Sequence, residues 1–189
     1  MLICARISRI LYFQQPSVKT SRPCFALLSF FLLYQQSYAL DSDREQDINI
    51  LSDTAIVNDK TGVTIYSGRV TIDQGTLHIA ADEVKVVMSE REVLQFIASM
   101  KPQSEGLAHY EQQQQQNNEL VSADAKTITY FLQEERLHLA GKAYLKQARD
   151  SFAGDLLHYD IAKGIVEATG GSEKSGDRVH VVISPKLAD

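Results

Sequence analysis

The sequence predicts an all-β protein, because apolar side chains recur at every second position and short turns often interrupt them. The alternation is clearest from Val63 to Met88, where four apolar segments carry polar residues on the opposite phase. Gln74-Gly75 and Ala81-Asp82 separate these segments and are expected to form turns. No window of ten or more residues downstream of the N-terminal apolar run predicts an amphipathic helix. Short strands and frequent turns favour a sandwich, barrel or jelly roll over βαβ units.

Residues 1–39 are predicted to be an export signal and are set aside from the fold. The apolar run Phe25–Tyr34 is followed by Ser37-Tyr38-Ala39, which offers small residues at the −3 and −1 positions of a signal-peptidase site. Cleavage is therefore expected between Ala39 and Leu40. The run is too short for a permanent anchor, because a transmembrane helix needs about 20 apolar residues.

The predicted signal is longer than usual. No methionine lies between Met1 and Met88, so translation from a GTG codon at Val18 is our hypothesis for the true start. Both cysteines, Cys4 and Cys24, fall within the signal. The mature chain is therefore expected to contain no thiol and no disulfide.

The predicted mature chain, residues 40–189, suits a single acidic domain. The signal takes four of the nineteen lysines and arginines and no acidic residue, so the formal net charge changes from −5 to −9. That charge disfavours nucleic acid and anionic membrane surfaces as partners, because both bind basic patches. About 150 residues are enough to bury a hydrophobic core.

A small residue followed by aspartate recurs four times and divides this domain into similar units. Each unit is predicted to contain a turn, a strand, a polar turn and a second strand. The pairs are Ser52-Asp53, Ala81-Asp82, Ala123-Asp124 and Gly154-Asp155. Aspartate bonds backbone amides in turns, and we prefer that role to metal binding. Residues 104–119 lengthen the middle unit, and the tract Gln112–Asn118 within them predicts a flexible polar loop.

A stack of such hairpins has two open ends, where edge strands can pair with another chain. Neither Ile48–Leu51 nor Val179–Ile183 contains a proline, which would weaken such pairing. The predicted docking residues are Ile48, Asn49, Ile50 and Leu51 near the N-terminal end and Val179, Val181 and Ile183 near the C-terminal end.

The sequence contains no recognisable catalytic or metal-binding motif. Its five histidines are scattered singly, and His78 and His138 fall on the polar phases of their strands. There is no nucleophile elbow and no phosphate-binding glycine loop. Glu134-Glu135 beside Arg136 is typical of a solvated hairpin tip. We expect no enzyme, no cofactor and no metal, and an enzyme on a β-scaffold that acts on envelope glycolipid stays an alternative.

One long apolar face is the candidate binding surface. Its residues share one phase of their strands and are Val70, Ile72, Leu77, Ile79, Val84, Val86, Leu94, Phe96, Ile128, Tyr130, Leu137, Leu139 and Leu145. Periodicity alone does not distinguish a sealed sandwich core from an apolar groove between two sheets. Both interpretations stay open.

The run from Ser67 to Val86, SGRVTIDQGTLHIAADEVKV, resembles the G-x-V-x-V-x-Q-G-x-[IL]-x-I-x-A-D-x-V segment of the OstA-like family of periplasmic lipopolysaccharide-transport proteins. Leu139–Gln147, followed by Gly154-Asp155, resembles the same family, as does the closing Val182–Pro185. The likeness covers nearly all of residues 40–187. The glutamine tract departs from the family pattern.

The resemblance implies a twisted antiparallel β-jelly roll, open at both ends, that holds the acyl chains of lipopolysaccharide. It implies head-to-tail homo-oligomers in the periplasm of a Gram-negative bacterium, with Ile48 and Ile50 lining the N-terminal opening. The implied partners are an inner-membrane anchored relative of the same fold and the N-terminal domain of an outer-membrane translocon. Two alternatives are a periplasmic adaptor that pairs edge strands without binding lipid, and the N-terminal-type domain of a paralogous outer-membrane assembly factor.

Overall fold

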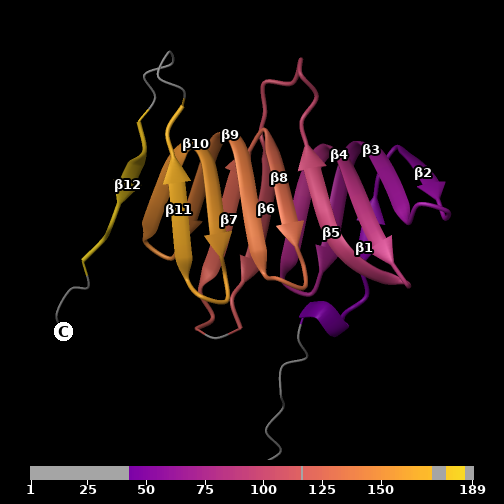
Figure 1. The fold of residues 1–189 in the computed structure, drawn as a ribbon, viewed down its shortest axis with the longest axis horizontal. Coiled ribbons are helices and arrows are strands. Elements are labelled where there is room, and N and C mark those ends of the chain that lie inside the picture. The colour runs from indigo at the N-terminus through magenta and orange to yellow at the C-terminus, as the bar shows by residue number, and fades with distance from the viewer. Residues whose placement is uncertain (1–42, 116, 172–177, 186–189) are drawn as a thin grey trace, which may run out of the picture. The chain divides into compact units, whose positions relative to one another are not determined.

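The computed structural model describes residues 43–115, 117–171 and 178–185, which belong to one compact unit. The predicted signal, its cleavage site at Ala39 and Leu40, and the hypothetical start at Val18 lie outside the described residues. The described residues include no helix long and apolar enough to cross a membrane. The all-β prediction is confirmed, because apart from the short 3₁₀ turn η1 (Asp43–Glu45) every regular element described is a strand (Figure 1).

Twelve strands of the described chain pair in antiparallel fashion. They are β1 (Asn49–Leu51), β2 (Thr54–Asn58), β3 (Val63–Gln74), β4 (Leu77–Ser89), β5 (Glu92–Ser99), β6 (Ala108–Gln113), β7 (Leu120–Ala125), β8 (Thr127–Phe131), β9 (Arg136–Gln147), β10 (Asp150–Asp160), β11 (Ile165–Thr169) and β12 (His180–Val182). The pairings β4-β5-β8-β9-β7-β6 return to β4 and so close a ring. The remaining strands extend this ring toward either end of the stack.

The long strands pass from one layer of the fold to the other. In β4, His78–Ala80 pairs with β6, whereas Glu83–Ser89 pairs with β5. Strand β9 makes the same change of partner, from β8 to β7. Layer 1 therefore contains β1, β6, β7 and β12, and layer 2 contains β2, β5, β8 and β11. Each layer also contains half of β3, β4, β9 and β10.

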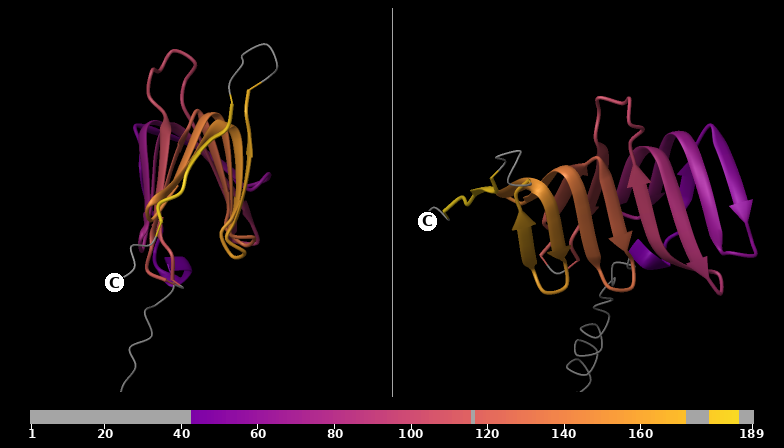
Figure 2. Two further views of the ribbon diagram at one scale, coloured as in Figure 1. Left: turned by 90° about the vertical axis from the view of Figure 1, so that its left-hand side faces the viewer. Right: turned by 45° about the horizontal axis from the view of Figure 1, so that its top comes forward.

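The two layers meet along one side and diverge toward the other (Figure 2). We call the side where strands cross between layers the ridge; it contains Asp53, Gly68, Asp82, Lys126, Gly141 and Gly154. Hairpin turns form the opposite side, the mouth, where Gly75-Thr76 ends layer 1 and residues 132–135 end layer 2. The 3₁₀ turn η1 lies at the mouth (Figure 2).

Backbone hydrogen bonding continues across the ridge. The amide of Asp53 donates to the carbonyl of Gly68 at 3.0 Å, and that of Lys126 donates to Gly141 at 2.8 Å. Gly68 and Gly141 have φ angles of 86° and 77°, a left-handed conformation that glycine adopts without steric cost. The long strands thus bend at these glycines, where the pairings of β3 with β4 and of β9 with β10 shift register.

Two predictions about local structure are wrong. Ala81-Asp82, Ala123-Asp124 and Gly154-Asp155 are not turns, because they lie within β4, β7 and β10. They lie at or near the ridge, where strands bend instead of reversing. The predicted loop at 104–119 is likewise wrong over Ala108–Gln113, because those residues pair with β7 and form β6. The predicted turn at Gln74-Gly75 and the hairpin tip at Glu134-Glu135 are confirmed.

Candidate groove and docking edges

The inner faces of the two layers carry the predicted apolar residues. Twelve of those residues are at most 4% exposed: Val70, Ile72, Leu77, Ile79, Val84, Val86, Phe96, Ile128, Tyr130, Leu137, Leu139 and Leu145. Ile48 and Ile50 are partly buried and pack against this cluster from the N-terminal end. The structure therefore brings these residues together as one surface. Near the ridge that surface is a close-packed core.

The inner-face prediction is wrong for Leu94. The pairing of β4 with β5 shifts between Val87 and Met88, so that Val87 faces Gln95 while Met88 faces Val93. Leu94 is the extra residue of this bulge, and Val93 contacts the core in its place. Leu94 instead lines a shallow outer cavity with Val87 and Phe131.

Asp43 of η1 is anchored to layer 1 at the mouth. Its carboxylate is 8% exposed and accepts hydrogen bonds from the Thr76 amide at 2.8 Å and the Thr76 hydroxyl at 2.6 Å. The side-chain amide of Gln112 donates to the same carboxylate at 2.8 Å. Gln74 donates to the carbonyl of Gln46 at 3.0 Å. Asp43 is a buried carboxylate whose charge is offset by three donors.

Arg44 extends from η1 to layer 2. Its guanidinium donates to the carbonyl of Leu132 at 2.6 Å and to Glu135 Oε1 at 2.8 Å. Both acceptors belong to the turn between β8 and β9. Consecutive residues of η1 therefore bond opposite layers, so that η1 crosses the mouth.

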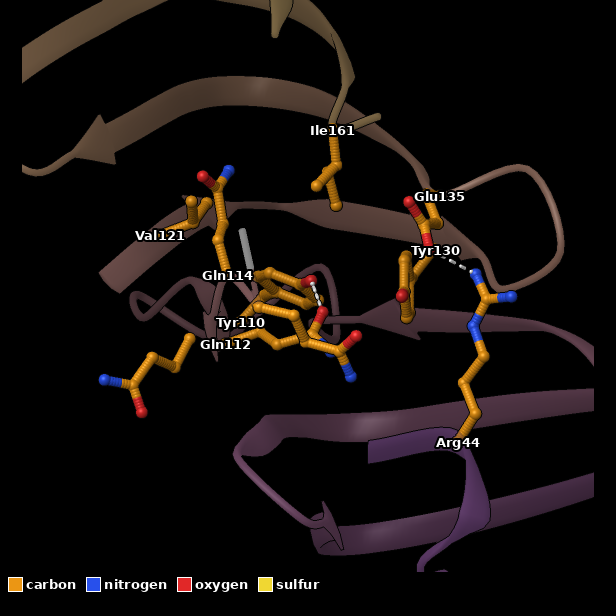
Figure 3. A pocket seen from close by; sticks show the side chains of 10 residues that line it. Arg44, Tyr110, Gln112, Gln114, Val121, Tyr130, Glu135 and Ile161 are labelled. Atoms are coloured by element: carbon orange, nitrogen blue, oxygen red, sulfur yellow. Dashed lines mark hydrogen bonds and ion pairs between the residues drawn. The ribbon is translucent and has the colours of Figure 1, made fainter. Parts of the chain in front are cut away.

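Two cavities open at the mouth, and Arg44 lines both; Figure 3 shows the smaller of them. The first encloses about 400 Å³ between Ile48, Met88, Val93 and Leu132, toward the N-terminal end. This volume falls in the range of roughly 300–1,000 Å³ that is usual for ligand pockets. The second cavity encloses about 90 Å³. Seven of its eleven lining residues are polar or charged, among them Arg91 and Glu92, so the first cavity is a mixed polar and apolar opening with room for a ligand.

Tyrosines fill the space behind the second cavity. Tyr110 of layer 1 and Tyr130 of layer 2 meet edge to face with their ring centroids 5.3 Å apart. Gln114, at the turn after β6, donates to the hydroxyl of Tyr159 in layer 2. Burial raises the pKa of Tyr110 well above its ordinary value and also raises the pKa of Tyr130. Both phenols therefore stay neutral at physiological pH.

The N-terminal end of the stack exposes two edge strands. In the described chain β1 pairs only with β3, as does β2. Leu51 is 69% exposed, and in β2 Ile56 and Val57 are 67% and 63% exposed. The backbone of each strand therefore has one free edge, flanked by exposed apolar side chains. Ile48 lies before the strand, whereas Asn49, Ile50 and Leu51 form it.

The C-terminal end has the same construction. Strand β12 pairs with β10 and with no other described strand, and β11 likewise pairs with β10. Exposed fractions are 38% for Val179, 44% for Val181, 71% for Ile183 and 50% for Ile165. The predicted docking segments are thus edge strands with their flanking residues. The repeat of two strands per unit predicted strands where β2 and β11 lie, but these two strands were not among the predicted docking edges.

The histidines of the central strands lie on the outer faces. His78 contacts Asp73 at 2.6 Å, and His109 contacts Asp124 at 2.9 Å. His138 meets His158 edge to face, and burial, together with the charges of His158 and Arg136, lowers the pKa of His138. In residues 43–115, 117–171 and 178–185, no three histidine, cysteine or acidic side chains form a group that could hold a metal ion.

The part of the chain that forms this two-layer arrangement matches a known family. The family model described as LptA/(LptD N-terminal domain) LPS transport protein matches residues 49–165. The chain belongs to this family. The match runs from the first residue of β1 to the first residue of β11, and so includes the ring of strands and the mouth turns.

Relatives of the LptA family support the match over most of the chain. The lipopolysaccharide export system protein LptH of Pseudomonas aeruginosa is 33% identical over 78% of this chain and 85% of its own length. The lipopolysaccharide export system protein LptA of Escherichia coli K12 is 30% identical over 79% of this chain and 77% of its own length.

A solved structure agrees with the fold. The crystal structure of LptH, titled as the LptA-homologous periplasmic component of the lipopolysaccharide transport device of Pseudomonas aeruginosa, superposes with a TM-score of 0.65 at 29% identity. The superposition covers 76% of this chain and 99% of that chain. The strand architecture is therefore shared with a structure determined by crystallography.

Proposed function

We propose that this chain is a periplasmic bridge that binds lipopolysaccharide through its acyl chains and passes it from the inner to the outer membrane. Membership of the LptA family carries this proposal. The fold supports it with an apolar interior that opens at the mouth and with free strand edges at both ends. On this reading the bent two-layer arrangement is a twisted β-jelly roll, and the protein is not an enzyme.

The energetics of acyl chains explain why a continuous apolar interior would be needed. Burying a chain of about a dozen carbons is worth on the order of 10 kcal/mol, at about 0.8 kcal/mol per methylene. Release into water between carriers would cost the same amount. Transfer from one apolar wall to the next removes that barrier, and the energy that drives transport would come from another component.

Edge-strand pairing would supply the continuity between domains. The edges at β1 and β2 differ from those at β11 and β12, so pairing one end with the other is heterologous and builds open, head-to-tail chains. The proposed partners are other copies of this chain, an inner-membrane anchored relative of the same fold and the N-terminal domain of an outer-membrane translocon. Residues 1–39 would be removed during export.

Photo-crosslinking tests the groove. A photoreactive amino acid at Ile48 or Phe96 is expected to capture lipopolysaccharide in living cells, because both side chains contact the apolar core. The same amino acid at Arg69 or Lys85 serves as the matched control, and capture there is expected to be at background level. Equal capture at all four positions would contradict the groove.

Shortening the chain tests the docking edge. Deleting residues 179–183 removes β12, whose side chains are exposed and whose pairing is confined to one edge of β10. The domain is expected to stay folded by circular dichroism but to become monomeric in light scattering. Unchanged, concentration-dependent oligomers would rule out this edge as the docking surface.

The close packing of the interior favours one second candidate, a periplasmic adaptor that pairs edges without binding lipid. Both functions predict oligomers, but only the bridge predicts lipid binding. Titration of the purified protein with fluorescently labelled lipopolysaccharide distinguishes them. Saturable binding excludes the adaptor, and absence of binding favours it. Recovery of chemically unchanged lipopolysaccharide at the end of the titration also excludes the enzyme on a β-scaffold.

A further inference from the structure

A short polar segment, Asp43–Gln46, crosses the mouth and bonds both layers; we call it the strap. On the layer 1 side, Thr76 and Gln112 hold the carboxylate of Asp43. On the layer 2 side, Leu132 and Glu135 hold the guanidinium of Arg44. The strap is the point at which the described N-terminal segment ties together two turns that are 56 or more residues apart in the sequence.

The strap divides the mouth of the groove. Arg44 lines both the cavity of about 400 Å³ and the cavity of about 90 Å³. The apolar side chains of the larger cavity, such as Ile48 and Met88, lie toward the N-terminal end. Tyr110 and Tyr130 line the smaller cavity together with Arg44 (Figure 3). An acyl chain that entered the larger cavity would therefore meet Arg44 before it could extend along the groove.

The strap is also connected to the residues that fill the groove behind it. Gln112, which donates to Asp43, accepts a hydrogen bond from the hydroxyl of Tyr110 at 2.6 Å. Tyr110 is fully buried and contacts Tyr130 of the opposite layer. Release of Asp43 would therefore free Gln112 and remove one constraint on the tyrosine pair between the layers.

The hydrogen bonds that hold the strap can break without breaking the pairing between strands. Its contacts with the two layers are made by side chains or by single carbonyls, and none belongs to a strand ladder. All four strap residues are polar, so the strap carries no apolar side chain of its own into water when it departs. Opening the mouth at the strap therefore leaves the backbone pairing of both layers intact.

We propose that the strap is a releasable gate, which must leave the mouth before an acyl chain held in the larger cavity can extend between the two layers. This inference rests on the proposed function, because it concerns the path of the lipid that the groove would bind. It adds that the free protein is closed at Arg44, and that the N-terminal cavity is the entry site for the chain.

Covalent closure of the strap provides the test. The variant Arg44→Cys/Glu135→Cys of the chain from residue 40, which has no other cysteine, is treated with a short bifunctional maleimide that replaces the Arg44–Glu135 contact with a permanent link. Uptake of dansyl-undecanoic acid and of fluorescently labelled lipopolysaccharide is then followed by fluorescence. The linked protein is expected to lose at least nine-tenths of the uptake shown by the same variant treated with a monofunctional maleimide.

The two controls separate the gate from the groove. Equal uptake by the linked and unlinked proteins would overturn the gate and leave the groove intact. Absence of uptake by the unlinked variant and by the unsubstituted chain would overturn the proposed function and the gate together. Circular dichroism before and after linking checks that the layers stay folded.

A second variant weakens the strap instead of locking it. Asp43→Ala removes the acceptor for Thr76 and Gln112, and the rate of uptake is expected to rise about tenfold because release no longer breaks those bonds. Glu45→Ala is the matched control, because Glu45 lies in the same turn and is exposed. An unchanged rate in Asp43→Ala, or an equal rise in Glu45→Ala, would contradict the gate.

Discussion

The ridge and the mouth of this molecule are held together by different means. At the ridge the chain itself passes between the layers, with backbone bonds such as Lys126 to Gly141, and side chains add to them. Lys126, for example, donates to the carbonyls of Ser104 and Gly106 at 2.7 and 2.9 Å. At the mouth the layers end in separate hairpin turns, joined mainly by the strap and by the bond from Gln114 to Tyr159. From this difference we expect any separation of the layers to begin at the mouth, with the ridge as the more strongly bonded side.

Truncating core residues should give the largest difference between the two sides. Leu139 lies beside the ridge and is 0% exposed, whereas Met88 lies at the mouth and is partly buried. Leu139→Ala is expected to lower the free energy of unfolding by about 2–5 kcal/mol and Met88→Ala by about 1 kcal/mol. Urea denaturation measures both values. Equal losses would mean that the packing is uniform from ridge to mouth.

Glycine substitutions compare the two sides through the backbone. A Cβ atom on Gly68, at φ 86°, would collide with the side chain of Asp53, whereas one on Gly164, at φ 66° in a mouth turn, would meet nothing within 4 Å. Gly68→Val is expected to cost about 2–3 kcal/mol and Gly164→Val about 1–2 kcal/mol, because only the first adds a collision to the backbone strain. Thermal unfolding of the two variants shows which of them loses more stability. A larger loss for Gly164→Val would argue against the ridge as the rigid side.

The sequence predicted the buried interior well but missed the bends at the ridge and the side-chain bonds across the mouth, for a physical reason. Alternation along one strand was enough to identify Ile72 and Leu139 as inward-facing. It failed at Leu94, because the bulge depends on the register with the neighbouring strand. The strap was missed because Asp43 and Arg44 find their partners 33 to 91 residues away, and polar residues carry no periodic signal. The glutamine tract was misread because composition does not reveal that Gln112 and Gln114 meet partners within the mouth.

Breaking the strap should change the free energy of unfolding less than the core substitutions at Leu139 and Met88 or the glycine substitutions at Gly68 and Gly164. Arg44→Ala removes a half-exposed ion pair with Glu135 and one bond to a carbonyl. Exposed ion pairs contribute little, so the free energy of unfolding is expected to fall by about 1 kcal/mol or less. Hydrogen exchange should nevertheless rise in the turns at Gly75-Thr76 and residues 132–135 and stay unchanged at the ridge. Faster exchange at the ridge would show that the strap supports the whole fold and not only the mouth.

The smallest expected effect is a pH dependence that originates at the ridge. Hydrogen bonds from the Ser104 hydroxyl and the Lys101 amide lower the pKa of Asp82 in the folded protein. Because the folded pKa lies below the unfolded value of about 3.9, the stabilisation is complete above about pH 4 and is lost as the pH falls through the folded pKa. Asp82→Asn should therefore flatten the loss of stability with acid, measured by urea denaturation between about pH 5 and pH 2.5. Asp59→Asn, in the turn between β2 and β3, changes the charge equally and should leave that slope as it is. A parallel change in both variants would show that the effect comes from net charge. The contacts of Asp82 at the ridge would then not matter for stability.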